Sequence, residues 1–204
     1  DSWEHQSDLY DYFECMEIFE LPVDGDAANK RWVVYSGDAR YAVGDFDGKR
    51  FTPEHEGKHR LHYGTYYASQ TFNNAPGGRK IQVGWNTSLA APEAPYAGHH
   101  SFPHELTLHA EAIGIRMRAN PIEEIKELRA KSYRMDTVEL SPGSPAVLPI
   151  LSNTFELTLE FDPGYSEQVF INIPGTHIRY KTKEQIIEHR EITLEVIDLS
   201  LIHI

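Results

Sequence analysis

The chain has 204 residues, 40% of them hydrophobic and 25% charged, which is the composition of an ordinary soluble globular protein. Its 19 lysines and arginines against 31 acidic residues give a net charge of -12 without a basic cluster, which argues against tight nucleic-acid binding. No apolar run is long enough to cross a membrane, and the single cysteine, Cys15, excludes an intrachain disulfide framework.

Residues 13–117 carry short strand-forming segments separated by turns. Gly37-Asp38 and Asp47-Gly48 are hairpin signals, and residues 86–100 are expected to form an irregular loop. The predicted strands are Arg31–Ser36, Arg40–Gly44, Phe51–Thr52, Tyr66–Phe72, Lys80–Trp85, Glu105–His109 and Ile113–Arg118. Turns about every ten residues favour a β-sandwich, barrel or propeller over an alternating α/β fold, and periodicity alone does not choose among the three.

One helix is predicted, at 121–132, with Asn120 as its N-cap and Pro121 in its first turn. Alternating strands are expected after it, and they are placed at 154–161, 168–173, 177–181 and 191–197. In the first of these, apolar and polar residues alternate, which is typical of a half-buried antiparallel sheet. We therefore predict two β domains, 1–120 and 133–198, joined by a helical linker at 121–132.

The two ends of the sequence each suggest where they come from. Because Asp1 is not an initiator methionine, we expect the sequence to start inside a longer protein. Residues 199–204, Leu-Ser-Leu-Ile-His-Ile, match the translation of a transposase adapter used in sequencing libraries. We expect this tail to be adapter-derived, with a natural terminal strand as the alternative, and exclude it from the fold prediction.

Glu14 is the first candidate for chemistry. It lies in an aromatic, strand-forming run, residues 11–20, where an ionised carboxylate is costly unless something uses it. From the local pattern alone, a solvated strand residue or one end of an ion pair remains the alternative interpretation.

A series of ordered segments surrounds this residue in the sequence. They are Phe13-Glu14-Cys15, 19–25, 32–34, 41–48, 51–52, 67–72, 77–79, 84–85 and 101–108. In this order they resemble glycoside hydrolase family 32, the levanases, inulinases and invertases. The resemblance extends from Tyr12 to Ile197 and is weaker after Pro121.

The resemblance implies an all-β fold, with the later blades of a five-bladed β-propeller followed by a truncated β-sandwich. Members of the family hydrolyse β-fructosidic bonds with retention, and their acid/base glutamate stands in a Glu-Cys-Pro motif, which assigns that role to Glu14. The aspartate nucleophile and the transition-state-stabilising aspartate stand in Asn-Asp-Pro and Arg-Asp-Pro motifs, which this chain lacks and which are expected upstream. Because retention needs a second carboxylate about 5 Å away, the isolated chain is expected to be inactive.

The resemblance also implies a substrate pocket. Tyr66, Tyr67 and Gln70 fall where family members line that pocket, and Trp85 keeps its place, either stacking on a sugar or, as we favour, filling an interface between blades. The chain departs from the family pattern at Met16, which replaces the usual proline, and at Thr65, Asn86 and His104. These departures keep open an alternative, a non-catalytic carbohydrate-binding protein of the same fold.

Neither a cofactor nor a metal is expected. The spacing of His99, His100 and His104 matches no closed tetrahedral zinc signature, so a surface loop with incidental histidines is the better interpretation. The expected partner is a fructan or fructoside, with no nucleic acid and no membrane, and the oligomeric state stays open. Because the family is often exported, a secreted or periplasmic location is expected.

Overall fold

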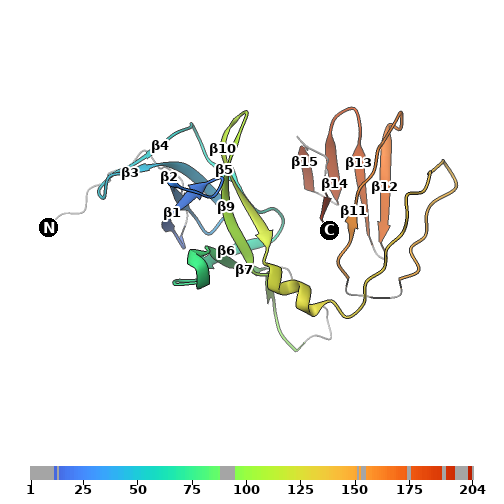
Figure 1. Cartoon of the computed structure of the whole chain (residues 1–204), viewed down its shortest axis with the longest axis horizontal. Helices are drawn as coiled ribbons and strands as arrows, with labels where there is room; N and C mark the ends of the chain where they lie inside the picture. Colours follow the sequence, from blue (N-terminus) through green and yellow to red (C-terminus); the bar gives the residue numbers. More distant parts are fainter. Residues whose placement is uncertain are drawn as a thin grey trace. The chain divides into compact units, whose positions relative to one another are not determined.

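The computed structural model describes residues 12, 14–87, 95–150, 152, 155–173, 176–189, 192–195 and 202–203. The chain divides into two compact units, Asp1–Ala130 and Lys131–Ile204. In both units the regular secondary structure of the described residues consists mainly of strands (Figure 1). No helix within the described ranges is long and apolar enough to cross a membrane.

The N-terminal unit contains one ten-stranded sheet made of two groups of strands. The first group is antiparallel and consists of β1 (Glu17–Val23), β2 (Asp26–Tyr35), β3 (Arg40–Phe46) and β4 (Phe51–Pro53), with β5 (His59–Arg60) also paired to β3. The second group consists of β6 (Tyr66–Thr71), β7 (Ile81–Asn86), β8 (His99–His100), β9 (His104–Glu111) and β10 (Gly114–Pro121), with the short 3-10 helix η1 (Pro76–Gly78) between β6 and β7.

Apolar side chains from both groups form one core. Because successive side chains of a strand point to opposite faces, β1 places Phe19, Leu21 and Val23 on the same buried face. The remaining buried members of this core are Val33, Tyr35, Ala39, Tyr41, Val43, Leu106, Leu108 and Met117. Burying one large apolar side chain contributes about 1.5–3 kcal/mol, so this core is the main force that holds the two groups together.

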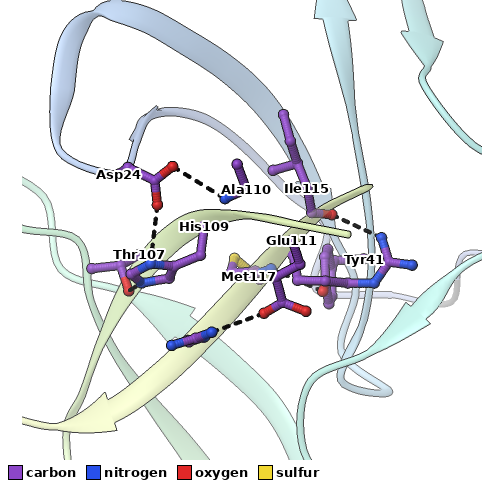
Figure 2. A network of polar contacts seen from close by, with 10 residues as sticks. Asp24, Tyr41, Thr107, His109, Ala110, Glu111, Ile115 and Met117 are labelled. Atoms are coloured by element: carbon purple, nitrogen blue, oxygen red, sulfur yellow. Dashed lines mark hydrogen bonds and ion pairs between the residues drawn. The ribbon is translucent and has the colours of Figure 1, made fainter. Parts of the chain in front are cut away.

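The two groups meet where β1 ends beside β9. Val23 pairs in parallel with Leu108, whose carbonyl also accepts a hydrogen bond from the amide of Asp24 at 2.9 Å. The Asp24 carboxylate accepts a hydrogen bond from the amide of Ala110 at 3.3 Å, and its other oxygen lies 3.3 Å from Nδ1 of His109 (Figure 2). We call this set of contacts the β1–β9 seam.

A second buried contact strengthens the same region. The amide of Met117, in β10, donates to the hydroxyl of Tyr41, in β3, at 3.0 Å (Figure 2). Tyr41 is only 2% exposed, and burial raises the pKa of its hydroxyl above the ordinary value. The phenol therefore stays protonated, with its oxygen free to accept the amide.

The C-terminal unit holds a smaller sheet. β12 (Gln168–Ile173), β13 (Thr176–Lys181), β14 (Ile186–His189) and β15 (Ile192–Glu195) form an antiparallel four-stranded sheet, and β11 (Thr158–Leu159) pairs with β16 (Ile202–His203). Ile178 and Tyr180 are its buried apolar residues in the described part. On the adjacent strand, Glu188 binds the side chains of Arg179 and Lys181.

The predicted helix differs from the one observed. Asn120 and Pro121 belong to β10 and pair with Glu105 and His104, and only the 3-10 helix η2 (Glu123–Leu128) follows. Ile122, not Asn120, occupies the N-cap position, and no side chain caps the helix. The prediction of a helix over 121–132 was therefore wrong in type and extent, because pairing with β9 outweighs a local capping signal. Pro121 is tolerated because β10 is an edge strand.

Two further predictions change in detail. The strand expected over 154–161 is a strand only at Thr158–Leu159 in the described residues, where it pairs with β16. Residues 99–100 of the expected irregular loop form β8 against β7. Phe13, much of the 86–100 loop and most of the 199–204 tail lie outside the described residues.

The β1–β9 seam generates a stability prediction. Replacing Asp24 with alanine removes the acceptor of the Ala110 amide and the partner of His109, so we expect the free energy of unfolding to fall by about 1 kcal/mol. Urea denaturation followed by tryptophan fluorescence measures this, because all three tryptophans lie in the N-terminal unit. The matched control is Asp45→Ala, an exposed aspartate of β3. Equal effects of the two substitutions would contradict the role of the seam.

Candidate active site

Glu14 lies just before β1, with its side chain exposed. Its carbonyl oxygen accepts a hydrogen bond from the amide of Gly37 at 2.9 Å, and the carbonyl of Gly37 accepts one from the amide of Ala68 at 2.8 Å. The turn between β2 and β3 therefore connects the Glu14 segment to β6 through the backbone of a single residue. We call these two hydrogen bonds the Gly37 bridge.

The bridge favours a glycine because the backbones approach closely. A Cβ atom built on Gly37 would lie 3.1 Å from the carbonyl oxygen of Glu14 and 3.3 Å from Cβ of Cys15. Both distances are tighter than nearly all real contacts of a Cβ atom. A Cβ atom at this position would require the Glu14 segment to shift by a few tenths of an ångström.

A β-bulge in β6 decides which side chains reach Glu14. Tyr67 faces Trp85 of β7 and Gln70 faces Val83, so the two residues between Tyr67 and Gln70 stand opposite one residue of β7. The first of them, Ala68, has a φ of 47°, a left-handed conformation that is costly for alanine. In a regular strand, residues three apart point to opposite faces, and the bulge turns Tyr67 and Gln70 toward the same segment.

The structure brings three of the predicted site residues together. The hydroxyl of Tyr67 donates a hydrogen bond to Oε1 of Glu14 at 2.8 Å. Nε2 of Gln70 donates to the carbonyl of Cys15 at 3.3 Å. The hydrogen bond to Glu14 raises the pKa of Tyr67 to about 12, so the phenol is a proton donor to the carboxylate at neutral pH. Among the described residues, this pair engages only Oε1 and leaves the second carboxylate oxygen of Glu14 open to a ligand.

Tyr66 does not join this group. Its hydroxyl donates to Oε1 of Gln82 at 3.2 Å, and its ring stacks on His62 with 3.8 Å between the centroids. The ring also covers Gly84, where a Cβ atom would lie 2.3 Å from Cζ of Tyr66. Neighbouring residues of a strand point to opposite faces, so Tyr66 packs into the unit while Tyr67 reaches Glu14.

Trp85 stands opposite Tyr67 in the β6–β7 pair, and its side chain is 47% exposed. Whether it stacks on a sugar or fills an interface between blades therefore stays a prediction. Gly98 packs against the indole, because a Cβ atom there would lie 2.5 Å from Nε1 of Trp85. The exposed aromatic face next to Tyr67 is the kind of surface on which a sugar can stack.

A buried polar cluster lies on the face to which Tyr66 points, and sequence reasoning missed it. It consists of His62, Tyr66, Gln82 and His104, with 5.2 Å between the ring centroids of His62 and His104. Burial, assisted by the nearby His104, lowers the pKa of His62 to about 4. His104, one of the departures from the family pattern, packs against His62, and burial lowers its pKa too.

Among the described residues, no group of three or more histidine, cysteine, aspartate or glutamate side chains is placed to hold a metal ion. Nε2 of His99 lies 2.9 Å from Nδ2, the side-chain amide nitrogen of Asn86. Cys15 is a free cysteine, with a φ of 51°, between Glu14 and the start of β1.

The site thus presents one exposed carboxylate, a phenol that donates to it and an aromatic surface beside it. A carboxyl group in this setting can give or take a proton. Displacement at a sugar carbon with retention needs a second carboxylate about 5 Å from the first. In the described residues the partner of the Glu14 carboxylate is the Tyr67 phenol.

Comparison with known sequences gives a consistent result. The family model of the glycosyl hydrolases family 32 N-terminal domain matches residues 2–119. A levanase of Bacillus subtilis is 33% identical over 174 residues, which cover 74% of this chain and 26% of the levanase. A cell wall isozyme of β-fructofuranosidase from Zea mays is 27% identical over 86% of this chain and 37% of its own length. The chain thus spans about a quarter to a third of these relatives.

Comparison with solved structures supports the fold. An exo-inulinase from Aspergillus awamori superposes with a TM-score of 0.63 at 18% identity, covering 93% of this chain and 44% of the inulinase. A fructofuranosidase variant from Schwanniomyces occidentalis, complexed with fructosylnystose, superposes with a TM-score of 0.62 at 17% identity, covering 93% of this chain and 48% of its own. The mainly-β chain therefore has the β-propeller fold of these neighbours in its curled sheet.

The buried histidine generates a pH prediction. The pKa of His62 is about 4 in the folded state and 6.5 ordinarily, so between these values the unfolded state binds more protons. Stability should therefore fall as the pH falls from 6.5 to 4, by roughly 3 kcal/mol for this group. We expect His62→Gln to flatten the pH dependence of the urea midpoint, whereas His100→Gln, at an exposed position in β8, leaves it unchanged. An unflattened curve in His62→Gln would contradict the assignment.

Proposed function

The chain belongs to glycoside hydrolase family 32, and on that premise we propose that it carries the acid/base part of a retaining hydrolase of β-fructosidic bonds. The substrates would be fructans or sucrose-like fructosides, the class named in the relatives and in the ligand of the fructofuranosidase complex. The observation that carries the proposal is the hydrogen bond of 2.8 Å from Tyr67 to Glu14.

Glu14 is the acid/base in this proposal. As an acid it protonates the oxygen of the leaving group, and as a base it later takes a proton from the attacking water. Tyr67 orients one carboxylate oxygen, so that the other faces the scissile bond. A second carboxylate, from an Asn-Asp-Pro segment that this sequence does not contain, would attack the anomeric carbon and form the covalent intermediate.

The remaining site residues take binding roles in the proposal. Trp85, half exposed and across from Tyr67, offers an apolar face to the sugar, and Gln70 holds the backbone next to the acid. Tyr66 contributes indirectly, by packing β6 against β7 through the close contact with Gly84. No cofactor is required, because proton transfer and carboxylate attack complete the reaction.

The proposal also assigns an architecture to each part of the chain. We assign residues 1–120 to the later blades of a five-bladed propeller and 133–198 to a shortened β-sandwich. The cell wall isozyme among the relatives supports a secreted or periplasmic location. The second candidate function is carbohydrate binding without cleavage, favoured by Met16 in place of the usual proline and by the exposed Trp85.

The decisive experiment supplies the missing carboxylate. We would join the N-terminal part of the Bacillus subtilis levanase to this chain, so that the chain replaces the matching stretch of 174 residues. In this chimera, Glu14→Gln should lower fructose release from levan by about 10²–10⁴-fold, the usual contribution of general acid–base catalysis.

The control is Glu20→Gln, a solvent-facing glutamate of β1 that pairs with Lys30 at 3.2 Å and should leave the rate unchanged. Circular dichroism of both variants monitors the fold. Unchanged turnover in Glu14→Gln would overturn the catalytic assignment. Retained levan binding without turnover in the unsubstituted chimera would instead favour the binding protein.

A further inference from the structure

Besides the Gly37 bridge, three side-chain contacts connect the Glu14 segment to β6, and the proposed reaction leaves the last of them without a role. Tyr67 holds the Glu14 carboxylate, and Gln70 holds the carbonyl of Cys15. The next residue of β6, Thr71, holds the carboxylate of Glu17 at the start of β1. The contacts follow the two segments in parallel order, so each one limits how far the segments can slide or separate.

The Glu17 contact has the most hydrogen bonds of the three. The amide of Thr71 lies 3.1 Å from Oε1 and 3.0 Å from Oε2, and the hydroxyl of Thr71 donates to Oε1 at 2.8 Å. The contact is partly buried, and hydrogen bonds to an ionised group are roughly twice as strong as those between neutral groups. Glu20, on the same strand, faces solvent and pairs with Lys30.

These contacts matter because no β-ladder joins the two segments. In the described sheet, β1 pairs with β2 and β9, whereas β6 pairs with β7. The bulge at Ala68 further loosens the register of β6, since it interrupts the pairing with β7 between Tyr67 and Gln70. Apart from the Gly37 bridge, side chains alone set the spacing between Glu14 and Tyr67.

We propose that Glu17 is a positioning residue for Glu14: by clamping Thr71 it sets the distance between the acid/base carboxylate and the phenol that orients it. The inference rests on the proposed function, because the position of the Glu14 carboxylate affects the rate only if Glu14 takes part in the reaction. Glu17 itself touches no substrate in this proposal. Its carboxylate is occupied by Thr71 on both oxygens.

The kinetic test uses the levanase chimera. Glu17→Ala should lower kcat about tenfold and change KM less than about twofold. A misplaced acid stabilises the transition state less but leaves the binding of substrate nearly unchanged. Thr71→Val keeps the amide donor and loses the hydroxyl, so its loss should be smaller. Thr71→Ser keeps both donors and should retain full kcat. Glu20→Ala is the matched control on β1 and should behave as the unsubstituted chimera.

A second readout does not depend on turnover. The Gly37 amide donates to the carbonyl of Glu14, so its hydrogen exchange reports whether the Glu14 segment stays in place. Glu17→Ala should accelerate this exchange about tenfold relative to Glu20→Ala. Thr71→Val, which keeps the backbone contact, supplies the measurement if Glu17→Ala fails to fold.

Together, kcat and hydrogen exchange at Gly37 distinguish a failure of the positioning role from a failure of the proposed function. A lower kcat together with faster Gly37 exchange supports the positioning role. An unchanged kcat overturns it, and so does a lower kcat with unchanged Gly37 exchange. If the unsubstituted chimera releases no fructose, the proposed function fails. Gly37 exchange then still decides whether Glu17 sets the spacing between the Glu14 segment and β6, and unchanged exchange overturns that too.

Discussion

The Gly37 bridge is the constraint on which the site depends. Its two hydrogen bonds, of 2.9 and 2.8 Å, join the Glu14 segment to β6 through one residue, and the close approach makes any Cβ atom at this residue a tight fit. Without this bridge, the exposed Glu14 carboxylate and the Tyr67 phenol would belong to segments that share no backbone pairing. The geometry of the acid therefore follows from a turn between two other strands.

β1 is fixed at both ends by different means. At its C-terminal end the β1–β9 seam combines a parallel bridge with the contacts of Asp24. Between the ends, Phe19, Leu21 and Val23 are buried in the core that both groups of strands share. At its N-terminal end, Glu17 meets Thr71 and the chain then turns out to Glu14. A strand anchored in the core thus carries an exposed end that holds the proposed acid, which is how a scaffold places a functional group at its surface.

Much of the fold in the N-terminal unit was predictable because its signals are local. Gly37-Asp38 and Asp47-Gly48 mark turns whose flanking strands, β2, β3 and β4, occur where the pattern predicted them. The helix at 121–132 was mispredicted because Asn120 is a good N-cap only if its strand has ended, and pairing with β9 extends that strand to Pro121. In the C-terminal unit, β14 was not predicted at all, since 182–189 mixes charged and apolar residues without a clear alternation.

The sequence by itself determined the family, the mainly-β class and the identity of Glu14 as the candidate acid, because ordered motifs and turn residues are properties of consecutive residues. Only the tertiary structure decided that Tyr67 and Gln70 reach the Glu14 segment while Tyr66 turns away, and that Thr71 engages Glu17. The physical reason is the bulge at Ala68: one residue with a left-handed backbone reverses the facing of the strand, and its partners lie more than 50 residues away. The alternation of polar and apolar residues along the sequence does not reveal this reversal.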